Sequence, residues 1–149
     1  MQDSGLSLIL GLYRTANAVV RNLDQRLTHD GDVTFVQAVT LMAVKSFDHP
    51  QPHLVAEYLG QQSQTVTGVL DRLESAGYVQ RVRDLFDRRA VRLELTSKGE
   101  EVADRVSQEL GDHVGELLRG IDADMQRRLA AGLEALETSL KERSMSQVR

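Results

Sequence analysis

The sequence predicts a mainly helical fold with one small β-hairpin. Apolar residues recur at helical spacing over most of the chain, whereas residues 78–96 contain two strand candidates around a polar loop. At 149 residues the chain is long enough for one domain with its own core. Within residues 61–96 a helix, a hairpin and a basic loop follow one another. This is the order of a winged helix, which places a helix in the DNA major groove and a loop beside it.

The first predicted helix spans residues 6–28, and a break is expected at residues 28–32. Its apolar side chains form one wide stripe: Leu6, Ile9, Leu12, Tyr13, Ala16, Val19, Val20, Leu23 and Leu27. A second helix is expected to begin at Thr34, because Thr34 and Gln37 fit a capping box, and to end near Phe47. Its expected buried residues are Phe35, Val39, Met42 and Ala43.

A helix-turn-helix comes next in the chain. A short third helix at His53–Leu59 is closed by Gly60, and residues 61–63 form a tight connection to a fourth helix. The apolar residues of the fourth helix share one face: Val66, Val69, Leu70 and Leu73. Gly77 is expected to end this helix, because glycine readily takes the left-handed conformation of a helix stop.

The hairpin is the most basic part of the chain. Tyr78–Arg83 is its first strand, and apolar and polar residues alternate in the second strand, residues 91–96. The wing loop, residues 84–90, joins the two strands. Residues 81–92 contain five arginines and two aspartates, whereas the whole chain has a net charge of −4. Such a local basic patch is compatible with DNA binding, because attraction to phosphate acts over about 10 Å.

Two more helices are expected after the hairpin. The fifth begins at a capping box formed by Ser97 and Glu100 and ends near Arg119. The sixth is capped by Asp122 and runs to about Arg143, and the last six residues are expected to fray. Its apolar residues form one stripe: Met125, Leu129, Leu133, Leu136 and Leu140.

The apolar stripes at both ends of the chain need partners. We expect a single domain in which residues 30–99 form a DNA-binding lobe, and residues 1–29 and 100–149 fold together as a dimerisation lobe. A second copy of the chain would cover the stripes, and two winged helices on a twofold frame read a palindrome. The alternative is that these helices complete the core of a monomer.

Composition excludes several functions. The chain has no cysteine, so a disulfide, a thiolate metal site and a thiol redox switch are impossible. No apolar run is long enough to span a membrane and no signal peptide is visible, which predicts a cytoplasmic protein. The histidines lack the spacing of a metal site: His29, His49, His53 and His113. No nucleophile–base arrangement or cofactor motif suggests an enzyme.

The chain resembles the MarR family of transcriptional regulators over nearly its whole length. The resemblance rests on QTVTGVLDRLESAGYVQR at Gln64–Arg81, on DRRAVRLELTSKG at Asp87–Gly99, and on the lengths of the flanking helices. It implies a homodimer that binds pseudopalindromic double-stranded DNA, mostly as a repressor. It also implies release of DNA when a small aromatic or phenolic compound binds between the two lobes. The chain departs from the family pattern at Gly68, Leu85 and Phe86.

Residues of the fourth helix that point away from its apolar face are the candidates for reading DNA. Three of them are base-edge candidates: Gln64, Thr65 and Thr67. Glutamine can pair with adenine through two hydrogen bonds, and a threonine methyl can meet a thymine methyl. Gln62 and Ser63 are placed to hold a phosphate through backbone N–H groups and a cap hydroxyl. Arg72 is better placed for phosphate than for bases.

On the wing loop, Arg88 or Arg89 is expected to enter the minor groove, whose narrow form attracts arginine. Asp87 is expected to orient one of them through a salt bridge. Arg81 and Arg83 are expected to clamp the DNA backbone.

Three questions stay open at this point. Gly68 either lets the helix backbone approach the groove floor or marks a position without readout. Phe86 is expected to fold back on the hairpin, and intercalation is the alternative. Effector residues are unknown, although Tyr13, Phe35 and Phe47 are candidates besides their role in the core.

The rival function is a winged-helix module for protein–protein interaction without DNA binding.

Overall fold

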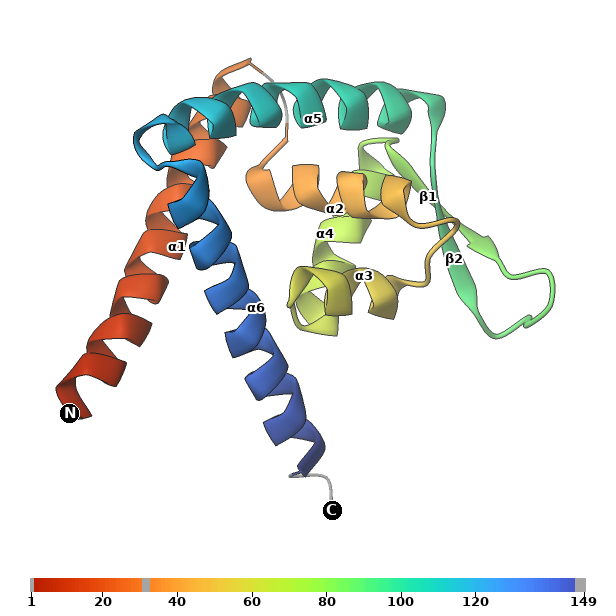
Figure 1. The fold of residues 1–149 in the computed structure, drawn as a ribbon. Helices are drawn as coiled ribbons and strands as arrows, with labels where there is room; N and C mark the ends of the chain where they lie inside the picture. Colours follow the sequence, from red (N-terminus) through yellow and green to blue (C-terminus); the bar gives the residue numbers. More distant parts are fainter. Residues whose placement is uncertain (1, 31–32, 147–149) are drawn as a thin grey trace. The chain divides into compact units, whose positions relative to one another are not determined.

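The structure is a computed structural model that describes residues 2–30 and 33–146 (Figure 1). Its elements are α1 (Gln2–Asp30), α2 (Phe35–Ser46), α3 (Pro52–Leu59), α4 (Ser63–Ser75), β1 (Val79–Arg83), β2 (Val91–Leu95), α5 (Ser97–Leu117), η1 (Leu118–Gly120) and α6 (Ala123–Ser146). They confirm the predicted mainly helical fold with one hairpin. The chain separates into two compact units, Met1–Gly111 and Asp112–Arg149. Among the helices of the described residues, none is long and apolar enough to cross a bilayer.

The core of the first unit includes α2, α4 and the hairpin. Leu70 and Leu93 are fully buried in it. Strands β1 and β2 pair antiparallel, with Val79 opposite Leu95. The backbone N–H of Leu93 donates to the carbonyl of Pro50 (2.9 Å), which joins the hairpin to the loop between α2 and α3. The inner end of the hairpin is therefore fixed to the helix-turn-helix.

Helix α2 begins as predicted but buries a different face. The Gln37 N–H donates to the Thr34 hydroxyl (3.2 Å), and the Thr34 N–H donates to the Gln37 side-chain oxygen (2.9 Å), which completes the capping box. The prediction that Phe35, Val39 and Met42 are buried is wrong. They are half-buried, because they line a cavity. The buried residues of α2 are Ala38, Thr40, Leu41, Ala43 and Val44.

Two predicted glycine stops are confirmed, and one predicted helix cap is wrong. Gly60 and Gly77 follow α3 and α4 with φ values of 63° and 78°. The cap of α5 is Thr96 and not Ser97. The Thr96 hydroxyl accepts from the Gly99 N–H (3.0 Å) and donates to the Gly77 carbonyl (2.6 Å). The hairpin brings Thr96 back to the end of α4, so Thr96 reaches both groups.

A salt-bridge cluster joins α2 to α5. Lys45, in the last turn of α2, pairs with Glu100 (2.9 Å) and with Asp104. Hydrogen bonds to Asp104 and Glu100 raise the pKa of Lys45 above its ordinary value. These contacts hold the first half of α5 beside the helix-turn-helix.

Helix α1 leaves most of its predicted apolar stripe in solvent. Of that stripe, only Leu23 and Leu27 are buried, and Leu6 is 61% exposed. The helix continues through Asp30, so the predicted break does not begin at residue 28; residues 31–32 lie outside the described chain.

Helix α6, in the second unit, is also amphipathic and open to solvent. Asp122 caps it as predicted, with its carboxylate accepting from the Met125 N–H (2.8 Å). The helix continues to Ser146, so fraying from residue 144 is wrong for the described residues. No described residue of α6 is buried, and Leu129 is 54% exposed. An apolar stripe of this length normally packs against a partner.

Candidate nucleic-acid interface

The solvent-facing side of α4 carries the predicted DNA-reading residues. Its opposite face is buried as predicted, with Val66 and Leu70 in the core. The exposed residues on the solvent side are Gln64, Thr65, Thr67, Asp71, Arg72 and Ser75. A Cβ added at Gly68 would find no neighbouring heavy atom within 4 Å, so packing inside the chain does not require glycine there.

The first turn of α4 differs in detail from the prediction. Ser63 is the first helical residue rather than the cap, so the predicted cap hydroxyl is wrong. The N-cap is Gln62, whose side chain makes no capping hydrogen bond within the described chain. The Thr67 hydroxyl donates to the Ser63 carbonyl (2.9 Å), so the hydroxyl proton of Thr67 is engaged within the helix. The exposed N-terminus of α4 has the polarity that attracts anions.

Arg81 fixes the first strand against α4. Its Nη2 lies 2.8 Å from the Asp71 carboxylate, and its Nη1 pairs with Glu74. Both acidic residues lie on α4, so the ion pairs cross from the helix to β1. The guanidinium that was predicted to clamp the DNA backbone is therefore engaged by two carboxylates of the same chain.

The base of the wing loop is organised by Asp84, which is buried. One carboxylate oxygen of Asp84 pairs with Arg92 Nε, and the other accepts from the backbone N–H groups of Phe86 (2.7 Å) and Asp87 (3.1 Å). The Arg92 hydrogen bond and these backbone bonds lower the pKa of Asp84 from 3.8 to about 2. Arg92 also donates to the carbonyl of His49 (3.1 Å).

Sequence reasoning missed this anchor of the wing loop. The sequence pattern that predicts such a bond is an aspartate at the first position of a turn, because its carboxylate can accept from backbone N–H groups two residues further along the loop. His49 adds a second unusual feature, because it is the non-glycine residue with positive φ (49°) in the described chain.

The tip of the wing loop overturns two predictions. Phe86 does not fold back on the hairpin; it is 99% exposed, and Leu85 is 94% exposed. Asp87 forms no salt bridge with Arg88 or Arg89 among the described residues. Its carboxylate instead accepts from the backbone N–H of Arg89 (3.0 Å), so it shapes the loop backbone. Arg83, Arg88 and Arg89 are exposed.

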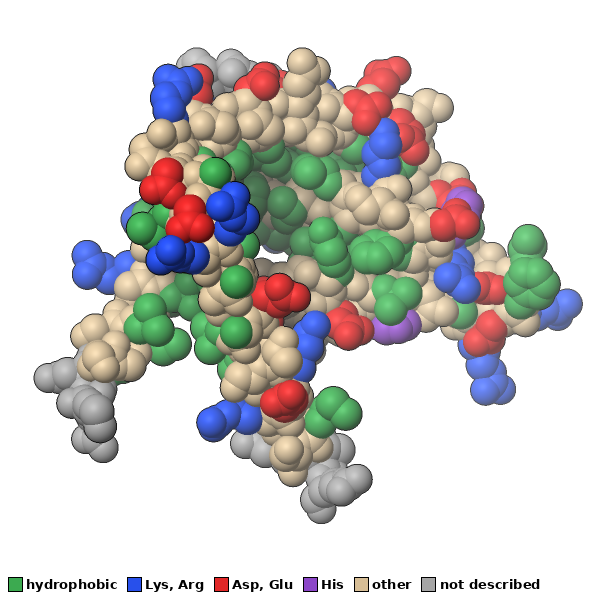
Figure 2. Space-filling model, viewed as in Figure 1, with side chains coloured by type: hydrophobic (Ala, Val, Ile, Leu, Met, Phe, Trp, Pro, Cys, Tyr) green, Lys and Arg blue, Asp and Glu red, His purple; other side chains and the backbone are tan. Residues whose placement is uncertain are grey.

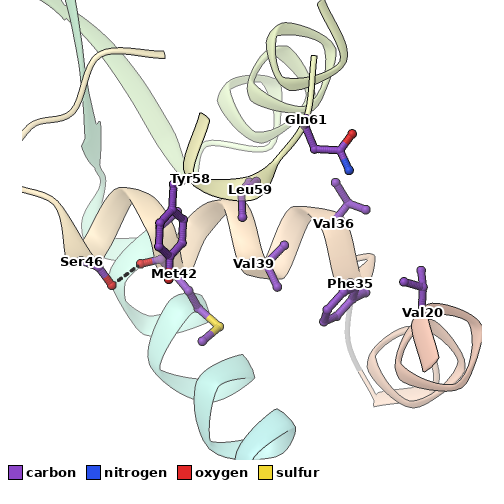
Figure 3. Close-up of a pocket in the computed structure, with 10 residues that line it drawn as sticks. Val20, Phe35, Val36, Val39, Met42, Ser46, Tyr58, Leu59 and Gln61 are labelled. Atoms are coloured by element: carbon purple, nitrogen blue, oxygen red, sulfur yellow. Dashed lines mark hydrogen bonds between the residues drawn. The ribbon is translucent and has the colours of Figure 1, made fainter. Parts of the chain in front are cut away.

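A cavity of about 440 Å³ lies in the first unit, apart from the wing loop. Figure 3 shows its lining side chains, which come from α1, α2, α3 and the residue after Gly60. They are Val20, Phe35, Val36, Val39, Met42, Ala43, Ser46, Tyr58, Leu59 and Gln61. None of these described residues is charged.

The three aromatic residues suggested as effector contacts differ in their relation to this cavity. Phe35 lines it, whereas Phe47 packs edge-to-face on the lining residue Tyr58, with ring centroids 5.3 Å apart. Tyr13 is exposed and does not line it. Over the described residues no cluster of His, Asp and Glu is arranged for a metal ion.

Known proteins resemble the chain in sequence and fold. The MarR family profile matches residues 31–90. The HTH-type transcriptional regulator SarZ of Staphylococcus haemolyticus (strain JCSC1435) is 31% identical over 101 residues, covering 66% of this chain and 68% of SarZ. The HTH-type transcriptional regulator TtmR of Methylorubrum extorquens (strain PA1) is 28% identical over 145 residues, covering 97% of this chain and 73% of TtmR.

Among solved structures, a cysteine-to-serine mutant of MarR from E. coli in complex with operator DNA superposes with a TM-score of 0.80 and 25% identity. The match covers 89% of this chain and 95% of the MarR chain. These similarities agree with the helix-turn-helix and hairpin of the structure, and they assign the chain to regulation rather than to enzymatic catalysis. The protein belongs to the MarR family and is a winged-helix transcriptional regulator.

Proposed function

We propose that this regulator binds a pseudopalindromic operator in double-stranded DNA as a homodimer, represses transcription, and releases DNA on binding a small phenolic compound. The observation that carries the proposal is the exposed polar face of α4 beside a hairpin with three exposed arginines, Arg83 at the end of β1 and Arg88 and Arg89 in the wing loop. The structure of MarR from E. coli with operator DNA supports the DNA part of the proposal.

In this proposal α4 supplies sequence discrimination. Gln64, Thr65 and Thr67 are the base-reading residues, because they lie near the exposed N-terminal end of the helix. The helix N-terminus at Gln62 and Ser63 holds a phosphate through backbone N–H groups. Arg72, in the last turn of α4, contacts a phosphate. The division follows from chemistry, since phosphate contacts position a protein and base contacts specify the sequence.

The hairpin supplies affinity. Arg83, Arg88 and Arg89 are exposed cations that can reach phosphates or the minor groove. Arg81 and Asp87 take positioning roles instead. Arg81 is held by Asp71 and Glu74, and Asp87 bonds to the loop backbone.

Dimerisation in this proposal uses both ends of the chain, residues 1–29 and 100–149. The exposed stripes of α1 and α6 support it, because each leaves large apolar side chains in water. A twofold arrangement then presents two α4 helices to the two halves of a palindrome.

Effector control uses the cavity beside α2. A carboxylate there would be buried without a cation, which is unfavourable, so the uncharged lining favours a neutral phenol over an aromatic acid. The Ser46 hydroxyl, which donates to the Met42 carbonyl (2.8 Å), keeps its lone pairs as acceptors for a phenolic proton (Figure 3).

A binding titration tests this function. Fluorescence anisotropy with the DNA upstream of the protein's own gene, at several salt concentrations, should show tight binding that weakens with salt and with added phenols. A scrambled duplex of the same composition is the control. Equal affinity for both duplexes, or none for either, would favour the rival function of a protein–protein interaction module.

A further inference from the structure

The tip of the wing loop places two large apolar side chains in water. Phe86 and Leu85 are 99% and 94% exposed, more than any other described large hydrophobic residue of the chain. Exposure of both side chains forgoes the stabilisation that burial would give. The isolated chain therefore gives no packing reason for this pair.

The loop beneath the tip is held in place by hydrogen bonds. The Asp84 carboxylate accepts from the backbone N–H of Phe86 (2.7 Å), and the Asp84 N–H donates to the Ala90 carbonyl (3.0 Å) at the other end of the loop. Arg92 links the same carboxylate to the carbonyl of His49. The exposed pair is thus presented by an anchored turn.

The charges around the tip indicate what it fits. Arg83 precedes the loop, and Arg88 and Arg89 follow the apolar pair. In the described chain none of these three arginines forms an ion pair with an acidic side chain. Figure 2 shows hydrophobic side chains at the projecting end of the hairpin with basic and acidic side chains beside them, and the exposed acidic residue of the loop is Asp87, whose carboxylate bonds to the Arg89 N–H. An apolar tip flanked by cations is complementary to a groove with an apolar floor of stacked bases and two rows of phosphates.

We infer that Phe86, supported by Leu85, is a wedge that enters the DNA minor groove and opens one base step in each half-site. This inference rests on the proposed function. The arginines neutralise the phosphates on both sides, while the phenyl ring stacks on the exposed base and bends the duplex away from the protein. Minor-groove proteins with apolar wedges kink DNA by roughly 20–90°.

The test uses the full chain and a duplex recovered by selection from random-sequence DNA. The duplex carries 2-aminopurine at successive flanking positions, which brightens on unstacking, and a dye pair at its ends, which reports bending. The variants are Phe86→Ala, Phe86→Leu as the conservative replacement, and Leu54→Ala as a control truncation of an exposed apolar residue outside the hairpin.

We expect the wild type to brighten one 2-aminopurine position per half-site and to bring the dyes closer. Phe86→Ala should lose both signals and bind roughly tenfold more weakly, with an unchanged salt slope, because no phosphate contact is lost. Phe86→Leu should keep part of both signals, and Leu54→Ala all of them. Because the Phe86 side chain is almost fully exposed, we expect the Phe86→Ala variant to have the same melting temperature as the wild type.

Two results would overturn the wedge and can be told apart. If the wild type binds the selected duplex and Phe86→Ala matches it in affinity, fluorescence and bending, the wedge is wrong and the proposed DNA binding stands. If no duplex is selected and Phe86 instead governs binding to vesicles of anionic lipid, both proposals fail.

Discussion

At the scale of single residues, the proposed interface contains side chains that we expect to contact DNA and side chains that shape the surface. Gln64 and Arg88 are exposed and belong to the first class in our proposal. Asp84 belongs to the second, because it is buried and bonded to the wing loop. DNA-binding titrations test the first class, and unfolding measurements test the second.

Gln64→Ala and Arg88→Ala should separate base reading from phosphate contact. Loss of Gln64 should cost about 1–3 kcal/mol on the selected duplex, relax one base position per half-site and leave the salt slope unchanged. Loss of Arg88 should weaken selected and scrambled duplexes alike and reduce the salt slope by about one. Titrations on both duplexes at several salt concentrations measure this. Equal weakening of both duplexes by Gln64→Ala would contradict the placement of α4.

Asp84 should make the stability of the hairpin depend on acidity. Its pKa is lowered from 3.8 to about 2, chiefly by the Arg92 hydrogen bond. A lowered folded-state pKa stabilises the protein fully above the ordinary pKa, and this stabilisation is lost as the pH falls toward 2. Urea unfolding of Asp84→Asn should therefore show lower stability at neutral pH and a smaller decline than the wild type below about pH 4. If the free energy of unfolding changes with pH in the same way for the two proteins, the Asp84–Arg92 bond does not stabilise the fold.

At the scale of elements, α4 and β1 are joined through Arg81. The ion pairs to Asp71 and Glu74 connect α4, the proposed base-reading helix, to the strand that leads into the wing loop. Exposed ion pairs of this kind contribute little to stability, about 0.2–1 kcal/mol each. We expect their larger effect to be on the orientation of the hairpin relative to α4.

Arg81→Ala and the double change Asp71→Asn with Glu74→Gln should both weaken DNA binding, because either removes the ion pairs that orient β1 against α4. If Arg81 clamped a phosphate, Arg81→Ala would still weaken binding, but the double change would have the opposite effect. Removal of its two carboxylates would free it and strengthen binding, most of all at low salt. Gln80→Ala is the matched control, since the Gln80 side chain donates to the Glu94 carboxylate across the hairpin (3.0 Å) and not to α4 among the described residues. Anisotropy titrations of the four proteins distinguish the two roles.

At the scale of the whole molecule, the exposed stripes of α1 and α6 determine assembly in our proposal. A charged residue in the stripe should disrupt it, whereas the same charge on the opposite face of the helix should be tolerated. The chain offers both positions on α6, at Leu129 and Thr138.

Leu129→Glu should convert a dimer at micromolar concentration into a monomer with weak binding to the full palindrome, and Thr138→Glu should stay dimeric. Removal of residues 121–149 should leave poorly soluble protein, because the exposed apolar stripe of α1 would lose its proposed partner in the dimer. Sedimentation velocity measures the mass of each variant. A monomeric mass for the full chain with intact palindrome binding would contradict the dimer.

Local patterns determined much of the fold from the sequence alone. The spacing of Val66, Val69, Leu70 and Leu73 fixed the buried face of α4, and with it the exposed residues. Gly60 and Gly77 gave the helix ends, and Thr34 with Gln37 gave the start of α2. Each of these features depends on neighbours within one or two turns, so the sequence carries it without the rest of the chain.

Only the tertiary structure decided where groups from separate elements meet. Arg81 reads as a free basic residue until β1 lies against the carboxylates of α4. Phe86 reads as a side chain that should be buried, yet the Asp84 anchor holds its backbone at the tip and directs it into water. Likewise, the apolar residues Phe35, Val39 and Met42 line a cavity because α1 and α3 leave space beside α2. Periodicity reports which face of an element is apolar, but only the packing of several elements determines what that face meets.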